Sequence, residues 1–426
     1  MSIKNKKSYP FSVDRTTQLL SWADKYKYFA YFNGNDHSTL HDPFPHLLFV
    51  GKRKYVESHE NSFSKLNQLI DESKGWLYGY LSYDLKNEIE FLESKNPATV
   101  PVNHLAFYEP EIIIHMESQA IKIESSVDPD GVYSKIFSIN KETSNKSPQE
   151  IGALNCNTSK KQFIDHVEKI KSEIVEGEFY EMNYCIEFTA TTISFDPLRC
   201  YLKLNSISPM PFSGIMRFGN IYLISASPER FLKKEKSKII SQPIKGTIRR
   251  GLGKVEDEFL KKSLQTSEKE RAENLMIVDL VRNDLAKSAI TGSVKVDELF
   301  GIYTFQKLHQ MISTVTATHK KDMPIAEILK HAFPMGSMTG APKIRVMEEI
   351  DLLESSSRGL YSGAVGFLTP DQDFDFNVVI RSLIYNSSSG KISFHVGSAI
   401  TFDSDPEYEY NECLLKAESL MEVLSK

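Results

Sequence analysis

The sequence of 426 residues predicts an α+β fold built on large antiparallel sheets. Runs of aromatic and β-branched residues, typical of strands, are mixed with amphipathic runs, typical of helices. These runs lack the regular strand–helix alternation that indicates a parallel sheet. Residues 375–402 contain two strand-like runs joined at residues 387–390, which indicates an antiparallel hairpin near the C-terminus.

Composition and charge are those of an ordinary globular protein. The hydrophobic fraction is 41%, the charged fraction is 25% and the formal net charge is −5, so collagen-like, disordered and membrane classes are excluded. No apolar run approaches the roughly 18 residues of a membrane helix, and the first residues lack the apolar stretch of a signal peptide. The four cysteines show no CxxC spacing. We therefore expect a cytoplasmic protein that binds neither a membrane nor, lacking a long basic cluster, a nucleic acid.

The chain divides into three parts by composition. Residues 140–159 are dense in Ser and Asn and hold few large apolar residues, which predicts a linker. The preceding region, residues 1–139, is expected to be β-rich, because residues 75–85 and 104–116 are aromatic and β-branched. Residues 160–426 form the third region, and we expect the parts to pack as one globular unit.

The third region opens with the clearest helical pattern of the chain. Phe163, Val167, Ile170 and Ile174 recur at spacings of four, three and four residues, and Gly177 stands where the helix should end. Residues 218–232 read as a strand running into a turn, and residues 311–320 alternate as a strand does. Five further helices are expected, three of them with proline in the first turn: 254–267, 270–288, 324–333, 342–354 and 406–424.

Two of these helices carry paired carboxylates three residues apart, and each pair lies on one helical face. The pairs are Glu270 with Glu273 and Glu409 with Glu412. If they meet, they make an oxygen-rich site suited to Mg²⁺, but an isolated pair of this kind is more often a solvated face. Lys416 lies one turn beyond Glu412 and is either its salt-bridge partner or an anion ligand.

A lysine in SQPIKGTIRRG, residues 241–251, is a candidate nucleophile. Lys245 follows an apolar residue and precedes a Gly-Thr turn, which indicates a partly buried strand end. Nucleophilic use requires burial or a nearby cation to lower its pKa, and the ordinary alternative is a strand lysine whose amine reaches solvent. Gly246 and Thr247 allow backbone N–H groups to approach an anion.

Glycine-rich turns at residues 336–342, 358–367 and 395–400 match no nucleotide-binding fingerprint. The first, GSMTGAP, precedes a helix and resembles a small-anion site at a helix N-terminus. His309 lies in an extended segment, where it is either an acid or base or a core histidine.

Taken in order, eight segments of the chain resemble the chorismate-utilising enzyme family. They are SPERF, PIKGT, ENLMIVDLVRNDL, KLHQMISTV, GSMTGAPKIRVMEEI, RGLYSGAVGF, FNVVIRS and DSDPEYEYNECLLKA. The resemblance covers roughly residues 160–424. It implies a large antiparallel β-sandwich flanked by helices, of the anthranilate synthase component I type, with chorismate bound through Mg²⁺ in a cleft.

The resemblance also implies roles for individual residues. Glu273 and Glu412 match direct Mg²⁺ ligands, and Glu270 and Glu409 match residues that hold metal-bound waters. Glu229 matches the acid that protonates the departing ring hydroxyl, and His309 matches a histidine close to that hydroxyl. Residues matched to substrate binding are Gly246, Thr247, Ser337, Thr339, Tyr361, Arg381, Gly397 and Lys416.

Within the family, Lys245 favours the group that makes 4-amino-4-deoxychorismate, the precursor of 4-aminobenzoate for folate. Its amine is expected to attack ring carbon 2 as the hydroxyl leaves carbon 4, after which ammonia attacks carbon 4 and expels the lysine. An acid at Glu181, where water-adding relatives carry lysine, disfavours water as the nucleophile. Amine-adding relatives more usually carry glutamine there, so Glu181 is a departure.

The chain shows no glutaminase motif, so ammonia is expected from a glutamine amidotransferase subunit or from solution. It lacks one segment of the tryptophan pocket of regulated relatives, although residues 208–212 resemble another. Two other functions remain open at this stage: an anthranilate synthase large subunit that happens to carry Lys245, and a non-catalytic chorismate-binding regulatory subunit.

Overall fold

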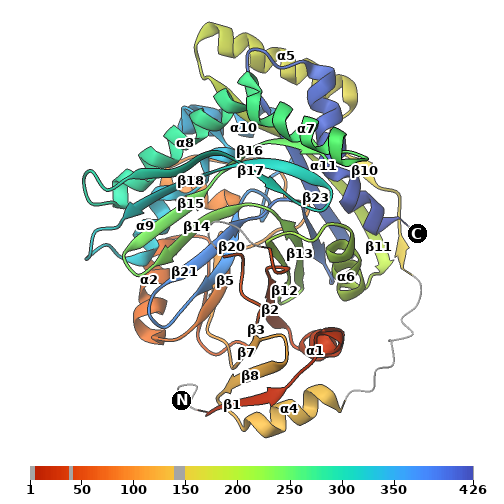
Figure 1. Ribbon diagram of the computed structural model, residues 1–426, viewed down its shortest axis with the longest axis vertical. Helices are drawn as coiled ribbons and strands as arrows, with labels where there is room; N and C mark the ends of the chain where they lie inside the picture. Colours follow the sequence, from red (N-terminus) through yellow and green to blue (C-terminus); the bar gives the residue numbers. More distant parts are fainter. Residues whose placement is uncertain (1–4, 38–41, 139–148, 426) are drawn as a thin grey trace.

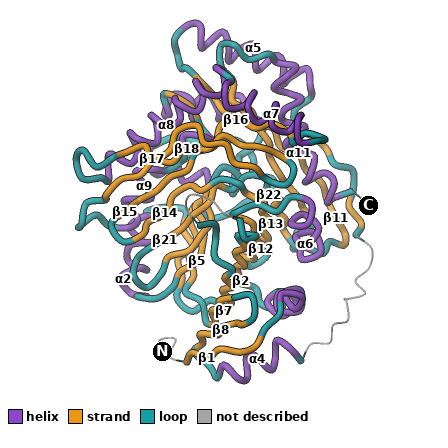
Figure 2. The backbone as a smooth tube through the Cα atoms, in the orientation of Figure 1, coloured by secondary structure: helices purple, strands orange, loops and turns teal. Residues whose placement is uncertain are grey.

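The computed structural model describes residues 5–37, 42–138 and 149–425, whose strands form two large sheets. In these residues the larger sheet has thirteen strands and the smaller has ten, and all of their pairs are antiparallel. Figures 1 and 2 show the strands inside and most helices at the periphery. This is the predicted α+β class.

In spatial order the larger sheet consists of β1 (Asn5–Pro10), β8 (Ala120–Ser125), β7 (Ile112–Met116), β3 (Leu47–Val50), β2 (Tyr28–Asn33), β12 (Phe212–Phe218), β13 (Ile221–Ser227), β22 (Ser382–Asn386), β23 (Lys391–Ile400), β11 (Glu181–Ser194) and β10 (Asn155–Cys156), with β19 (Gly340–Ala341) and β9 (Glu150–Ile151) also on β11. The smaller sheet consists of β16 (Ile244–Arg249), β18 (Leu308–Thr318), β15 (Lys238–Gln242), β14 (Arg230–Glu235), β21 (Phe374–Val378), β20 (Ala364–Leu368), β5 (Leu77–Leu81), β6 (Leu105–Tyr108) and β4 (Tyr55–Ser58), with β17 (Lys295–Thr304) on β18.

The helices are α1 (Thr16–Ala23), α2 (Ser62–Ser73), α3 (Lys86–Ile89), α4 (Pro129–Phe137), α5 (Lys160–Glu176), α6 (Pro197–Ile207), α7 (Lys254–Thr266), α8 (Glu268–Ser288), α9 (Ile325–Ala332), α10 (Lys343–Leu353) and α11 (Pro406–Leu424), and the 3₁₀ turns are η1 (Val13–Arg15), η2 (Tyr83–Leu85) and η3 (Gly336–Met338). All six expected helices form. Gly177 ends α5 with a φ of 86°, and a capping box from Ser159 and Gln162 begins it. No helix of the described residues is long and apolar enough to cross a membrane.

Strands from before and after the predicted linker share both sheets. β2 pairs with β12 in the larger sheet, and β5 pairs with β20 in the smaller one. The facing aromatic rings also mix the two regions, since Phe32 packs against Phe367 with ring centroids 5.3 Å apart. Of the predicted linker, residues 140–148 lie outside the described residues, and β9 and β10 pair with β11. Residues before and after the predicted linker therefore contribute to one hydrophobic core.

The chain crosses from one sheet to the other at places where the sequence predicts continuous strands. Residues 104–116 form β6 in the smaller sheet and β7 in the larger one, rather than a single strand. The expected hairpin at residues 387–390 is present between β22 and β23. Its first strand is broken into β21 and β22 at Arg381, whose φ of 49° is incompatible with an extended strand. Another crossing, between β13 and β14, holds Glu229.

Candidate active site

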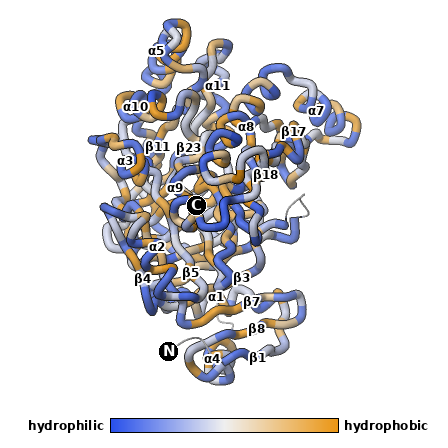
Figure 3. The backbone as a smooth tube through the Cα atoms, turned by 90° about the vertical axis from the view of Figure 1, so that its left-hand side faces the viewer, coloured by the Kyte–Doolittle hydropathy of each residue, from blue (hydrophilic) through white to orange (hydrophobic). Residues whose placement is uncertain are grey.

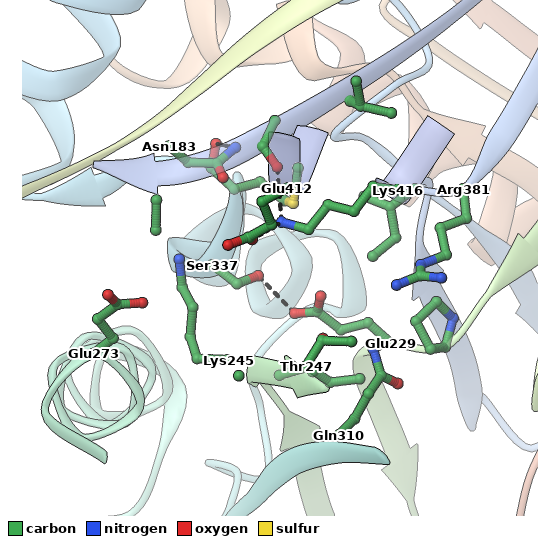
Figure 4. Close-up of a pocket in the computed structure, with 18 of the residues that line it drawn as sticks. Asn183, Glu229, Lys245, Thr247, Glu273, Gln310, Ser337, Arg381, Glu412 and Lys416 are labelled. Carbon is green, nitrogen blue, oxygen red and sulfur yellow. Dashed lines mark hydrogen bonds and ion pairs between the residues drawn. The ribbon is translucent and has the colours of Figure 1, made fainter. Parts of the chain in front are cut away.

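A single cleft collects most of the predicted site residues. It has a cavity volume of about 120 Å³ and lies between strands of both sheets, η3 and the two carboxylate-bearing helices α8 and α11. In Figure 4, Lys245 and Glu229 point into the same space, with Glu273 on one side and Arg381 on the other. The predicted residues that line it are Glu229, Lys245, Gly246, Thr247, Glu270, Glu273, Ser337, Tyr361, Arg381, Gly397, Glu409, Glu412 and Lys416.

Lys245 enters the cleft because β16 is irregular at this point. The pairing of β16 with β18 shifts register between Ile244 and Thr247, and such a bulge re-aims the side chains within it. Gly246 has a φ of 89°, and a Cβ on it would lie 2.9 Å from Glu270 Oε2. Glycine therefore fits the bulge that presents Lys245 without the backbone strain that a side chain would add.

The amine of Lys245 is held by a buried carboxylate. Its Nζ donates to Glu181 Oε1 at 2.6 Å, and both side chains are almost wholly buried. Burial alone lowers the pKa of Lys245, but the charges of Glu181 and Glu273 outweigh it and raise the pKa overall. The resting lysine is therefore an ammonium group, and its use as a nucleophile requires the loss of a proton.

Glu229 lies at the crossing between β13 and β14 with its carboxyl group in the cleft. Burial raises the pKa of Glu229 from 4.5 to about 7, against the lowering effect of the Ser337 hydrogen bond and of Lys245. Ser337 Oγ donates to Glu229 Oε1 at 2.6 Å. A carboxyl group with a pKa near neutrality, within a cleft, can deliver a proton at physiological pH.

The two carboxylate pairs face one another across the cleft, each with a lysine. Glu412 pairs with Lys416 at 2.7 Å, and Lys269 Nζ lies 3.1 Å from Glu409 and 3.9 Å from Glu273. Burial and the charge of Glu412 raise the pKa of Glu270. Burial also raises the pKa of Glu273 from 4.5 to about 8, and its buried Oε1 has no hydrogen-bond partner among the described residues.

This donor set fits a divalent cation. Repelling carboxylates, one of them with a buried oxygen that lacks a donor, are stabilised by a positive ion. As the side chains stand, no three His, Cys, Asp or Glu groups of the described residues are arranged to hold a metal. Binding would thus require Glu409 and Glu412 to turn from their lysines.

A cationic and aromatic wall closes the other side. Arg381 lines this side of the cleft, and burial lowers its pKa to about 10. The charge of Glu412 opposes this decrease but is the smaller effect. Tyr361 stacks on His395 with ring centroids 5.0 Å apart. A planar guanidinium beside a tyrosine suits the carboxylate of a ligand.

Two predicted residues do not line the cleft. His309 Nε2 lies 3.0 Å from Asp257 of α7, and Nδ1 lies 2.9 Å from Thr304 Oγ1, so the ring is held on the opposite side of β18. Successive strand residues face opposite ways, and the neighbouring Gln310 lines the cleft instead. Thr339 is fully buried, and its carbonyl accepts from Asn183 N at 2.7 Å, which braces the turn that carries Ser337.

Sequence reasoning missed several lining residues. His395 is 3% exposed, and within the part of the chain that the structure describes neither ring nitrogen has a hydrogen-bond partner. Burial lowers its pKa to about 4. Its place in the glycine-rich turn at residues 395–400 was the available signal. Lys269 directly precedes the first carboxylate pair. Asn183 and Gln310 carry no signal of their own, because only strand register places them in the cleft.

An internal ion pair fixes the strands beneath the cleft. Arg358 donates to both oxygens of Glu354, to Met338 O at 2.7 Å and to Asn183 O at 2.8 Å. Glu354 in turn accepts from Cys185 N at 3.0 Å. A buried pair whose remaining donors are satisfied joins η3 to β11 and holds their side chains in one geometry.

The chain belongs to the family of chorismate binding enzymes, which it matches over residues 11–422. Its relatives include the aminodeoxychorismate synthase component 1 of Escherichia coli K12, 34% identical over 83% of this chain and 78% of the relative. The anthranilate synthase component 1 of Saccharolobus solfataricus is 32% identical over 86% of each chain. The probable chloroplastic aminodeoxychorismate synthase of Oryza sativa is 44% identical over 63% of this chain, which spans only 30% of that relative's length.

Solved structures confirm the expected fold type. Anthranilate synthase component I of Streptococcus pneumoniae aligns with a TM-score of 0.77 and 23% identity, covering 91% of this chain and 95% of that one. MenF, the menaquinone-specific isochorismate synthase of Escherichia coli, aligns with a TM-score of 0.78 and 17% identity over 99% and 94%. At these identities the likeness concerns the fold alone.

Proposed function

We propose that this chain converts chorismate and ammonia into 4-amino-4-deoxychorismate through a covalent adduct on Lys245. The observation that carries the proposal is the bulge of β16, which aims a buried lysine into a cleft opposite Glu229. A binding module has no need of a buried nucleophile beside a proton donor. The aminodeoxychorismate synthases among the relatives support the same reading.

Some residues of the cleft bind the substrate, and others attack it or transfer protons. Arg381 and Tyr361 receive the enolpyruvyl carboxylate, and the turn at Gly246 and Thr247 faces the ring carboxylate. Lys245 attacks carbon 2 as the hydroxyl leaves carbon 4 with the proton of Glu229. Ammonia then attacks carbon 4 and displaces the lysine, so one difficult substitution becomes two easier ones.

Mg²⁺ is the cofactor that we propose for the carboxylates of α8 and α11. Glu273 and Glu412 would bind it directly, and Glu270 and Glu409 would hold its waters. When bound, it would neutralise the ring carboxylate and polarise it as a Lewis acid. The His309 role expected from the resemblance falls outside this proposal, since its ring lies behind β18.

Ammonia is expected from a glutamine amidotransferase partner, because the chain shows no glutaminase motif of its own. We further propose a cytoplasmic location and a place in 4-aminobenzoate and folate synthesis. Ammonium salts should replace the partner in a purified assay, and glutamine alone should not.

The identity of the product tests the proposed function. The purified chain is incubated with chorismate, Mg²⁺ and an ammonium salt, and the product is separated and identified by mass and by conversion to 4-aminobenzoate with an added lyase. The proposal requires 4-amino-4-deoxychorismate. The relation to the Saccharolobus solfataricus enzyme makes anthranilate the specific alternative. Fluorescent anthranilate formed without a lyase would establish it, and no turnover with the partner present would favour a regulatory subunit.

A further inference from the structure

The partner of Lys245 is the acidic side chain of Glu181, the first residue of β11. Glu181 is fully buried, and its Oε1 accepts from Lys245 Nζ at 2.6 Å. Its other oxygen, Oε2, is buried without a hydrogen-bond partner in the described part of the chain. Within the described residues, the one hydrogen bond of this carboxylate is therefore the bond from Lys245, which itself lines the cleft.

Glu181 is also rigidly placed. Its backbone pairs with Ala341 of β19, and a Cβ on the neighbouring Gly340 would lie 2.0 Å from Glu181 O. β19 directly follows the turn that carries Ser337, the partner of Glu229. The segment of residues 336–341 thus positions the carboxyl groups of both Glu229 and Glu181.

The buried lysine needs a proton acceptor inside the cleft. An ammonium group cannot attack carbon, and the burial of Lys245 keeps solvent from taking its proton. Its other charged neighbours come from the β13–β14 crossing, α8 and α11: Glu229, Glu270, Glu273, Glu412 and Lys416. Among these, Glu229 is engaged with Ser337, and the α8 and α11 carboxylates are the proposed metal ligands. Glu181 is the one hydrogen-bonded to the amine, at a distance that suits direct proton transfer.

We propose that Glu181 takes the proton of Lys245 before the attack and returns it when the lysine leaves. This inference rests on the proposed function and adds a positioning residue that acts through Lys245. Proton transfer would be the role of Glu181 at a position where amine-adding relatives usually carry glutamine.

The proton and electron balance closes over one cycle. The proton moves from Lys245 Nζ to Glu181, and the freed lone pair of the amine forms the bond to carbon 2. At the same time the carbon–oxygen bond at carbon 4 breaks. The hydroxyl leaves as water after it receives the proton of Glu229. Ammonia forms its bond to carbon 4, and the bond between carbon 2 and Lys245 breaks, releasing a neutral amine. Glu181 then reprotonates the lysine, and Glu229 recovers a proton from the new ammonium group of the product.

The test measures adduct formation in the absence of ammonia, by rapid mixing with chorismate and Mg²⁺ followed by acid quench and mass spectrometry of the peptide with Lys245. Glu181→Gln should slow this step about 100-fold near neutral pH. The deficit should shrink as pH rises, because a larger fraction of Lys245 is then already neutral before the attack, while chorismate affinity stays near that of the parent.

Two further variants make the test specific. Glu187→Gln alters another buried glutamate of β11, which contacts Thr99, Asn157 and Ser393 outside the cleft, and should keep the parent pH profile. Because Glu181→Gln removes the partner of a buried ammonium group, Glu181→Asp, which keeps the charge, is measured beside it. It should be slower than the parent with an unshifted profile.

Three results would overturn the inference. In the first, Glu181→Gln keeps the adduct-formation rate and the pH profile of the parent. In the second, Glu181→Gln forms the adduct faster than the parent near neutral pH, which would mean that Glu181 only restrains the lysine. In the third, the pH profile of Glu181→Asp is shifted like that of Glu181→Gln. The proposed function fails separately, if the parent forms no adduct or makes no 4-amino product.

Discussion

At the scale of single residues, Glu229 illustrates how position sets chemistry. It lies at a crossing between two sheets, so its carboxyl group is surrounded by packed chain rather than water. Burial raises its pKa to about 7, and the hydrogen bond from Ser337 opposes that rise. The hydrogen bond from Ser337 therefore both orients the carboxyl group of Glu229 and lowers its pKa.

Replacing Ser337 by Ala should move the pH dependence of the chemistry in a defined direction. The Ser337 hydrogen bond lowers the pKa of Glu229, so its loss raises that pKa. The rate of adduct formation without ammonia falls as Glu229 loses its proton above about pH 7, and in Ser337→Ala this fall should begin at higher pH. Ser393→Ala, which removes a buried serine bonded to Glu187 outside the cleft, is the control. A shift to lower pH in Ser337→Ala would contradict the assignment of Glu229 as the acid.

His309 marks the limit of sequence reasoning at this scale. The motif that contains it, KLHQMISTV, does reach the cleft, but the adjacent Gln310 is the residue that enters. The direction of a strand side chain changes at every residue, so a motif match fixes the segment more securely than the residue. Lys245 and Glu229 both line the cleft, because each stands at a bulge or crossing that the motif itself contains.

At the scale of elements, helices were easier to predict than strands. α5 and α11 carry local signals, namely a capping box and Gly177 for α5, and Asp405 with Pro406 for α11. The break between β21 and β22 depends on which sheet each half joins, which no local pattern encodes. The carboxylate pairs were predictable as helical faces, whereas their meeting across the cleft depended on the whole fold.

The bulge of β16 yields a matched pair of glycine variants. Gly246→Ala and Gly177→Ala both place a Cβ at a positive φ, 89° and 86°. The first Cβ meets Glu270, whereas no atom of the described residues lies within 4 Å of the second. Each should lose about 1–2 kcal/mol of unfolding free energy from the left-handed backbone. Only Gly246→Ala should also lose adduct formation. Equal activity in the two variants, measured beside denaturant unfolding, would show that the bulge does not aim Lys245.

If the carboxylates of α8 and α11 bind Mg²⁺, the stabilisation of the fold by Mg²⁺ should depend on pH. The pKa of Glu273 is raised from 4.5 to about 8, so its contribution to stability is present in full below about pH 4.5 and is lost as pH rises through about 8. Mg²⁺ needs the deprotonated carboxylate, and should raise the melting temperature more at about pH 8.5 than at about pH 6.5.

Glu273→Gln should weaken this thermal shift at both pH values, whereas Glu418→Gln, on the exposed face of α11, should leave it unchanged. The comparison needs no turnover, so it is independent of the reaction. A full Mg²⁺ shift in Glu273→Gln would remove this residue from the metal site.

At the scale of the whole molecule, neither sheet belongs to one region of the sequence. Figure 3 shows hydrophobic segments inside the molecule. The early strands β3 and β5 are buried along their whole length. The core between Phe32, Phe49, Tyr78 and Phe367 joins β2, β3, β5 and β20. The cleft therefore depends on the N-terminal strands, although its lining residues come from residue 183 onward.

This interleaving predicts unfolding as one unit. Both tryptophans, Trp22 and Trp76, lie in residues 1–139, so fluorescence reports the N-terminal region while far-ultraviolet circular dichroism reports the entire chain. The two transitions in urea should coincide. An earlier fluorescence transition with most of the circular dichroism retained would instead identify an N-terminal domain that unfolds by itself.

The proposed attachment of chorismate to Lys245 on the way to the amino product is measured most directly by the mass of the peptide that contains this lysine. The parent chain is mixed with chorismate and Mg²⁺ without ammonia, quenched and digested, with Lys245→Ala treated alike. The parent peptide should gain the mass of one chorismate less one water, and ammonium should remove this addition. The variant should show neither the addition nor the 4-amino product. A Lys245→Ala chain that makes 4-amino-4-deoxychorismate at near the parent rate would contradict the proposed attachment.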